Sequence, residues 1–187
     1  MSLYFLSSNK HKVEEFRKFL SPEIEFKQLK LDLAEVQSLN PTNVITHKLN
    51  EARKIHKGEL IVEDSSLCLD ALNGFPGPLI KYFYEAIGKE GILKIVEKFN
   101  CNTAQAKTMI GYFNGKKIVF FEGITKGKIV PIKVDNDFGF DAIFAPKNQD
   151  KTYSEMTKEE KNKVSHRGKA LKKFKEYYLN KKIKDFA

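Results

Sequence analysis

The fold class is decided by the stretch Ala104–Val130, AQAKTMIGYFNGKKIVFFEGITKGKIV. Its many β-branched and aromatic residues lie on both sides of Asn114-Gly115, which predicts two long strands joined by a turn. Asn and Gly tolerate the positive φ angles that both central positions of a type I′ turn require, so we expect a tight two-residue hairpin here. Because strands joined by a hairpin run antiparallel, a purely parallel doubly wound sheet is disfavoured.

On the N-terminal side of this stretch, predicted strands and helices alternate. A buried strand is expected over Leu3–Leu6, and apolar residues at helical spacing then predict a helix that stops at Ser21-Pro22. A second strand is expected over Ile24–Leu29. The second helix is expected to start at Asn40, which can cap it, with Pro41 as its first residue.

The other elements follow the same rules of periodicity and turn composition. The further expected elements are short strands over Leu60–Glu63 and Leu67–Leu69, a rigid loop over Asn73–Pro78, and helices over Leu79–Ile87, Gly91–Phe99 and about His166–Leu179. In the last helix we expect Ala170, Phe174 and Tyr177 or Tyr178 to face the core. The sequence therefore predicts an α/β protein with a mixed sheet.

Length and composition favour one folded domain over residues 1–187. The 187 residues are 41% hydrophobic and include 15 Phe, enough to build a core. No apolar stretch approaches the roughly 18 residues that cross a bilayer, and the N-terminus lacks the pattern of a secretory signal. Cys68 and Cys101 are too few and too isolated for a disulfide framework or a zinc site. We expect a cytoplasmic protein with reduced cysteines.

The formal charge of +9 is concentrated near the C-terminus. Residues from Lys151 onward hold 12 basic and 5 acidic side chains, whereas residues 1–150 hold 21 and 19. A basic face of this kind could bind a polyanion such as nucleic acid or a polyphosphate. A solvated, lysine-rich helix explains the same composition, and composition alone favours that interpretation.

Ser7–Lys12 joins the first predicted strand to the first helix. Backbone N–H groups at a helix N-terminus can bind phosphate, and Lys12 could add a positive charge. Ser and Asn are also ordinary helix caps, and for this segment taken alone capping is the preferred interpretation.

Acidic residues form a second group: Glu35 in a loop, and Glu63-Asp64 at the end of a strand predicted to be buried. Adjacent carboxylates in such a place are costly unless they are hydrated, paired or bound to a metal. Oxygen ligands suit Mg²⁺, which uses one or two carboxylates and completes its shell with water and substrate phosphates. A simple turn at Asp64-Ser65 is an equally good explanation.

Aromatic and charged residues form two further groups. The loop Phe138–Asp141 combines aromatics, a glycine and a carboxylate, which suits a flat heterocyclic ligand or a core plug. Lys161, His166 and Arg167 stand close together before and at the start of the last helix. They could face one ligand or form an ordinary charged helix start.

Taken in order, these motifs resemble one family, the inosine triphosphate pyrophosphatases. The resemblance spans Ser7 to about Leu171. It rests on Ser7-x-Asn9-x-x-Lys12-x-x-Glu15, Val62–Ser65, Asn73–Gly77 with Lys81, Phe138–Asp141, Thr152–Met156, Glu160–Asn162 and Ser165–Arg167. Each motif alone is modest evidence, but their joint occurrence in this order is specific.

The resemblance implies hydrolysis of ITP, dITP and XTP to the monophosphate and pyrophosphate, with Mg²⁺ as cofactor. Glu35 and Asp64 would hold the metal, and Asp64, aided by Glu63, would deprotonate the attacking water. The lysines that would neutralise the triphosphate are Lys12, Lys48, Lys81 and Lys161. Further hydrogen bonds to phosphate would come from Ser7, Ser8, Asn9 and Ser65.

For the base, the resemblance implies that Phe138 stacks on the purine within the loop that also holds Gly139 and Phe140. Asp141, His166 and Arg167 would read the edge of the base. Adenine has an amino group in place of this keto oxygen, so hydrogen-bond donors aimed at the oxygen would lose their acceptor. The resemblance therefore implies a preference for hypoxanthine and xanthine over adenine.

The family also implies a fold, a long central mixed sheet with two α/β lobes around a deep cleft, and a homodimer that needs neither membrane nor nucleic acid. This sequence departs from the family pattern at Ser8, Ser66 and Ala142, which puts the fine geometry and substrate ranking in question more than the reaction. Two other hypotheses stay open. One is a nucleic-acid-binding module that uses the basic C-terminal segment, and the other is a pyrophosphatase for modified pyrimidine nucleotides.

Overall fold

The computed structural model describes residues 2–31, 33–135 and 138–186, with side chains up to Ile183. The chain forms two compact units, which are described separately below. Unit 1 contains the chain up to Asp64, Met109–Glu122 and the chain from Ala170 onward; unit 2 contains Ser65–Thr108 and Gly123–Lys169.

The strands of the described residues form a seven-stranded mixed sheet. Its order is β2 (Lys27–Leu29), β1 (Leu3–Leu6), β3 (Glu59–Leu69), β5 (Thr103–Phe113), β6 (Ile118–Ile129) and β7 (Phe144–Pro146), and β4 (Pro76–Gly77) pairs with β3. β1 is parallel to β2 and β3, whereas β4 and β7 run antiparallel to their partners β3 and β6. The predicted mixed α/β class is therefore confirmed.

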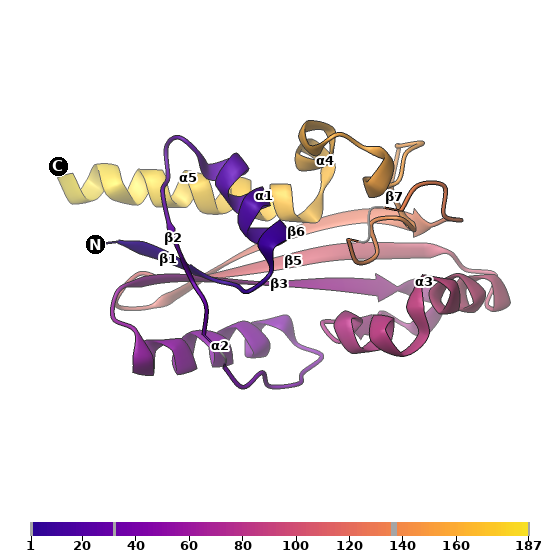
Figure 1. Cartoon of the computed structure of the whole chain (residues 1–187), viewed down its shortest axis with the longest axis horizontal. Helices are drawn as coiled ribbons and strands as arrows, with labels where there is room; N and C mark the ends of the chain where they lie inside the picture. Colours follow the sequence, from indigo (N-terminus) through magenta and orange to yellow (C-terminus); the bar gives the residue numbers. More distant parts are fainter. Residues whose placement is uncertain (1, 32, 136–137, 187) are drawn as a thin grey trace. The chain divides into compact units, whose positions relative to one another are not determined.

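Unit 1 has helices on both faces of its strands (Figure 1). Helix α1 (Lys10–Leu20) and the unit 1 part of α5 (His166–Phe186) share one apolar cluster with Phe5 and Tyr112 of the sheet. Helix α2 (Pro41–Ile55) packs Ile45 and Leu49 on the other face. Burial on both faces explains why β1 reads as a continuous apolar run.

The described residues of unit 2 pack around an apolar cluster. Helix α3 (Ile80–Lys98) contributes Ile80, Ile92 and Val96, and the loop around β7 contributes Ile143 and Phe144. The short helices η1 (Asp70–Leu72), η2 (Tyr153–Glu155) and α4 (Lys158–Val164) complete the unit. Helix α3 is interrupted at Gly88, whose φ and ψ are 64° and −173°, at the point where the sequence predicts a gap between two helices.

Local signals placed several elements correctly. β1 covers the predicted Leu3–Leu6, and α1 ends at Leu20, immediately before Ser21-Pro22. Asn40 caps α2 by accepting a hydrogen bond from the N–H of Thr42 at 2.9 Å, and Pro41 is the first helical residue. In α5, Ala170, Phe174 and Tyr178 are buried, as predicted.

The predicted type I′ turn is wrong in its geometry. β5 and β6 flank the loop as expected, but of Asn114 and Gly115 only Gly115 has a positive φ, +90°. The N–H of Asn114 donates to the carbonyl of Lys117 at 3.2 Å. The Asn114 side chain accepts from the N–H groups of Lys116 and Lys117 at 3.0 and 2.9 Å. Asn114 thus stabilises a four-residue loop with its side chain.

Other element boundaries also differ from prediction. The two short strands predicted over Leu60–Glu63 and Leu67–Leu69 are one strand, β3, because the polar residues between them keep the extended backbone. β2 is limited to Lys27–Leu29, and α5 runs on to Phe186. Within the described ranges, no helix is both long and apolar enough to span a bilayer.

Candidate functional site

In unit 1, the predicted phosphate loop leads directly into α1. Asn9 is the N-cap, and its Oδ1 accepts from the N–H of Lys12 at 3.1 Å. Ser7 Oγ accepts from the N–H of Asn9 at 3.2 Å, and Gln28 donates to the Ser7 carbonyl at 2.8 Å. Ser8 and Asn9 are exposed, so this helix start is ordered by its own side chains and accessible to an anion.

Lys12 and Glu63 form an ion pair between α1 and β3. Lys12 Nζ lies 2.6 Å from Glu63 Oε2, with the Glu63 side chain fully buried and the Lys12 side chain 21% exposed. A buried carboxylate needs a cation of this kind. The contact fixes the ammonium group of a residue in the first turn of α1 and leaves part of the Lys12 side chain open to solvent.

Asp64 follows Glu63 in β3, and the surroundings of its carboxylate differ from those of Glu63. Its Oδ2 atom is buried and has no hydrogen-bond partner among the residues that the structure describes. Burial raises the pKa of Asp64 to about 6. The positive charges of Lys12 and Lys48 oppose this shift, whereas the negative charges of Glu63 and Glu35 add to it.

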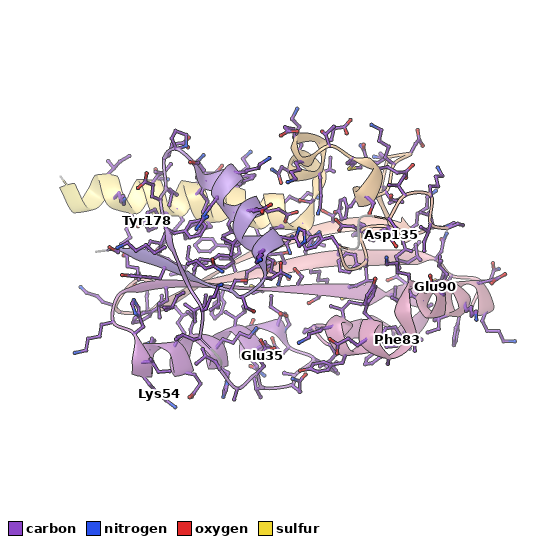
Figure 2. All side chains as sticks on the ribbon, viewed as in Figure 1. Glu35, Lys54, Phe83, Glu90, Asp135 and Tyr178 are labelled. Atoms are coloured by element: carbon purple, nitrogen blue, oxygen red, sulfur yellow. The ribbon has the colours of Figure 1, made fainter. Side chains whose placement is uncertain are left out.

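Glu35 and Lys48 form the second ion pair of unit 1. Lys48 Nζ, on α2, lies 2.7 Å from Glu35 Oε1, and the Glu35 side chain is 45% exposed. Figure 2 shows Glu35 beside α2, on the loop that precedes the helix. Both partners influence the pKa of Asp64, so the structure brings the predicted acids and two of the predicted lysines of this unit into one electrostatic group.

This group meets the requirements of a divalent cation in part. No cluster of three or more His, Cys, Asp or Glu side chains that could hold a metal occurs in residues 2–31, 33–135 and 138–186. Mg²⁺, however, needs only one or two carboxylates when water and phosphate oxygens supply its other ligands. The unsatisfied Oδ2 of Asp64 is a suitable first ligand, and the exposed Glu35 is accessible as a second.

In unit 2, Phe138 is the centre of a group of charged residues. Lys161 Nζ lies 4.6 Å from the centre of its ring, and the Arg167 guanidinium carbon lies 5.7 Å from it. Both distances are typical of cation–π contacts. The ring is partly exposed, while Lys161 and Arg167 are 8% and 4% exposed, so two buried cations adjoin an accessible aromatic face.

The two cations are held by polar partners within the same unit. Lys161 Nζ lies 2.6 Å from Asp141 Oδ2, and Asp141 is 3% exposed. Arg167 donates to Ser65 Oγ at 3.0 Å. Since these contacts fix both cations before any ligand arrives, the site is preorganised.

Three predicted residues have other surroundings. Phe140 is 8% exposed and belongs to the core of unit 2, where its ring contacts Phe144. Gly139 has a φ of +54°, and an added Cβ would meet nothing within 4 Å, so this position favours glycine for its backbone alone. Lys81 lies on the exposed first turn of α3, with its Nζ 5.7 Å from the ring centre of Tyr82.

His166 begins α5 and is 2% exposed. Its Nδ1 lies 3.4 Å from the hydroxyl of Tyr153, a residue to which sequence reasoning gave no role in the site. The signal was present, because Tyr153 lies within one of the family motifs, but the pairing joins residues 13 positions apart. Only the fold shows that Tyr153 contacts His166.

The comparisons with known proteins agree on one family. The model of the Ham1 family matches residues 3–177. The inosine triphosphate pyrophosphatase of Pyricularia oryzae is 42% identical over 179 residues, which cover 95% of this chain and 93% of that protein.

Solved structures give the same result. A Ham1 protein from Coxiella burnetii superposes with a TM-score of 0.80 at 24% identity, covering 96% of this chain and all of that one, which supports the fold. A nucleoside-triphosphatase described as a dITP/XTP pyrophosphatase, from Mycobacterium abscessus, has a TM-score of 0.74 at 26% identity, covering 93% of this chain and 98% of the other.

Proposed function

This chain belongs to the Ham1 family, and on that premise we propose that it hydrolyses non-standard purine nucleoside triphosphates to the monophosphate and pyrophosphate. Its relatives are named for ITP and for dITP and XTP, and we propose the same three substrates here. The single observation that carries the proposal is Asp64, a carboxylate whose buried Oδ2 has no hydrogen-bond partner among the described residues and which lies in the field of two lysines.

Asp64 is proposed as the general base. A pKa of about 6 leaves its carboxylate ionised near neutral pH while keeping it basic enough to accept a proton from water. The water oxygen then forms the new bond to phosphorus as the α–β anhydride bond breaks, and the departing pyrophosphate takes the bond's electron pair.

Glu63 receives a different role in this proposal. Its ion pair with Lys12 at 2.6 Å neutralises the carboxylate, which makes it a poor base and a good anchor for the ammonium group. Glu63 thus holds Lys12 beside the loop of Ser7, Ser8 and Asn9, where Lys12 would contact phosphate oxygens.

We propose Mg²⁺ as the cofactor, with Asp64 and Glu35 as the residues that would hold it. When bound, such an ion neutralises phosphate charge and lowers the pKa of its bound water. The charges of the group in unit 1 support a cation, because three carboxylates outnumber two lysines there, and a triphosphate would otherwise be repelled.

In unit 2, Phe138 is proposed to stack on the purine, with Lys161 and Arg167 beside it. Asp141, His166 and Arg167 are proposed to read the base edge, Ser65 to support Arg167, and Gly139 to allow the loop to turn. Lys48 and Lys81 are proposed as further phosphate contacts. A homodimer, a cytoplasmic location and a single functional domain over 1–187 stay predictions.

A panel of nucleoside triphosphates tests the proposal, with pyrophosphate release measured in the presence of Mg²⁺ and in the presence of EDTA. We expect rapid release from ITP, dITP and XTP, slow release from ATP and GTP, and none with EDTA. Equal rates with ITP and modified pyrimidine triphosphates would favour the alternative substrate class. No pyrophosphate from any purine nucleotide would refute the proposal.

A further inference from the structure

His166 is enclosed by aromatic rings inside unit 2. Its imidazole lies 5.8 Å from the ring of Phe140 and 5.6 Å from the ring of Tyr153, tilted by 31° and 34°. Because His166 is 2% exposed and Tyr153 is 1% exposed, water has little access to this stack. The imidazole therefore depends on protein groups for its hydrogen bonds.

The Tyr153 hydroxyl contacts two groups of His166, its backbone N–H and its Nδ1. The backbone N–H of His166 donates to the hydroxyl oxygen, and Nδ1 of the same residue lies 3.4 Å from that oxygen. Burial raises the pKa of Tyr153 above its ordinary value, so the hydroxyl keeps its proton. It can accept from the amide and still donate one hydrogen bond.

Thr125 is a further hydrogen-bond neighbour of this hydroxyl. Thr125 Oγ1 donates its only proton to the carbonyl of Val164 at 2.8 Å and accepts from Lys169 Nζ at 3.0 Å. Thr125 therefore has no proton to donate to Tyr153. Its remaining lone pair competes with Nδ1 for the single Tyr153 proton. Donation to Nδ1, together with acceptance from the amide, lets one hydroxyl serve both of these groups of His166.

We propose that Tyr153 is a positioning residue that donates to Nδ1 of His166 and thereby places the imidazole proton on Nε2. A neutral imidazole carries one proton, so an Nδ1 that accepts a hydrogen bond requires an Nε2 that donates one. Tyr153 would thus select which tautomer His166 presents, without touching the substrate.

The consequence for the base rests on the proposed function. An N–H at Nε2 can donate to the 6-keto oxygen of hypoxanthine or xanthine, whereas the amino group of adenine offers no acceptor there. Losing or mismatching one such bond in a dry site costs roughly 1–1.5 kcal/mol, about tenfold in kcat/KM. Tyr153 would therefore contribute to discrimination between keto purines and adenine through its contact with His166.

The direct test is NMR of the imidazole nitrogens in ¹⁵N-histidine-labelled protein at pH 8, without substrate. His166→Gln identifies the signal among those of the four histidines. We expect a protonated Nε2 and an unprotonated Nδ1 in the wild type, and a mixture of tautomers in Tyr153→Phe, which keeps the ring. A proton on Nδ1 in the wild type, or an unchanged signal in Tyr153→Phe, would overturn the proposal.

Kinetics give an independent readout. Tyr153→Phe should lower the ratio of kcat/KM for ITP to that for ATP about tenfold, mainly through KM for ITP. Tyr178→Phe is the matched control, since it removes another buried hydroxyl, one that donates to Glu59 at 3.1 Å in unit 1. An unchanged ratio in Tyr153→Phe contradicts the role in discrimination. If the wild type does not hydrolyse ITP, the proposed function fails, while the NMR result still decides the tautomer.

Discussion

Asp64→Asn should remove nearly all turnover and at the same time stabilise the fold at alkaline pH. The reason is the cost of ionising a carboxyl group that is largely shielded from water. Its pKa rises from 3.8 to about 6, roughly 2 units, and each unit corresponds to about 1.4 kcal/mol. Since Asp64 is only partly buried, solvent screening reduces the expected effect to about 2 kcal/mol.

The pH window follows from the sign of the shift. Between about pH 4 and pH 6 the folded protein holds a proton on Asp64 that the unfolded chain has lost, so the free energy of unfolding falls as pH rises through this range. The amide of Asp64→Asn has no proton to lose in this range, so the free energy of unfolding of the variant lacks this pH-dependent decrease. The variant should equal the wild type near pH 4 and exceed it at pH 8.

Urea unfolding with EDTA present measures this difference. At an m-value of about 2 kcal/mol/M, the midpoint of Asp64→Asn should lie about 1 M higher at pH 8. Added Mg²⁺ should reverse the order, because the ion stabilises only a chain that keeps the carboxylate. Turnover of ITP should fall by about 10²–10⁴-fold, the usual contribution of a general base.

Two results would refute this reasoning. A stability difference that is the same at pH 4 and pH 8 would show that the Asp64 carboxyl is not ionised against a desolvation cost. A variant with near-normal turnover would remove Asp64 from the role of base. Glu63→Gln is the comparison, since it leaves Lys12 without its partner and should destabilise the fold instead.

Phe138→Ala should raise KM for ITP about tenfold with a smaller change in kcat, measured by steady-state kinetics, and an unchanged KM would argue against stacking. Lys161→Met should destabilise the fold by about 3–5 kcal/mol in thermal or urea unfolding, because it strands the buried Asp141 carboxylate, and Lys161→Met with Asp141→Asn should recover much of that loss. Gly168→Ala should cost about 1–3 kcal/mol in the same assay, because its Cβ would lie 1.9 Å from the carbonyl oxygen of Asn162; an unaltered midpoint would contradict this.

Much of the secondary structure could be predicted because its causes are local. The cap at Asn40 acts on an N–H two residues away, and α1 ends where Ser21, the residue before Pro22, takes extended dihedral angles. Helix α3 is broken at Gly88 by one residue's own dihedral angles. Signals of this kind are complete within a few positions of sequence.

The site could be predicted as a set of residues but not as a set of partners. Motif order indicated Lys12, Glu63 and Asp64 together, yet only the fold pairs Lys12 with Glu63 and leaves Oδ2 of Asp64 without a hydrogen-bond partner among the described residues. That difference distinguishes an anchor from a base. The contact of Tyr153 with His166 was hidden for the same reason, because it depends on how η2 and α5 pack.

The basic segment from Lys151 onward has a third explanation, besides a polyanion site and a solvated helix face. Lys173 donates to the carbonyl of Glu122 at 2.7 Å, and Lys181 donates to Glu59, which is 7% exposed. Tyr178, labelled in Figure 2, donates to the same carboxylate.

These contacts attach α5 to the strands of unit 1, and losing Lys181 would leave the buried Glu59 carboxylate with its tyrosine hydrogen bonds but without this cation. Binding a nucleic acid through such lysines would require breaking bonds that the fold already uses. Part of the excess positive charge from Lys151 onward, which could have indicated a polyanion site, is therefore better explained by the packing of α5.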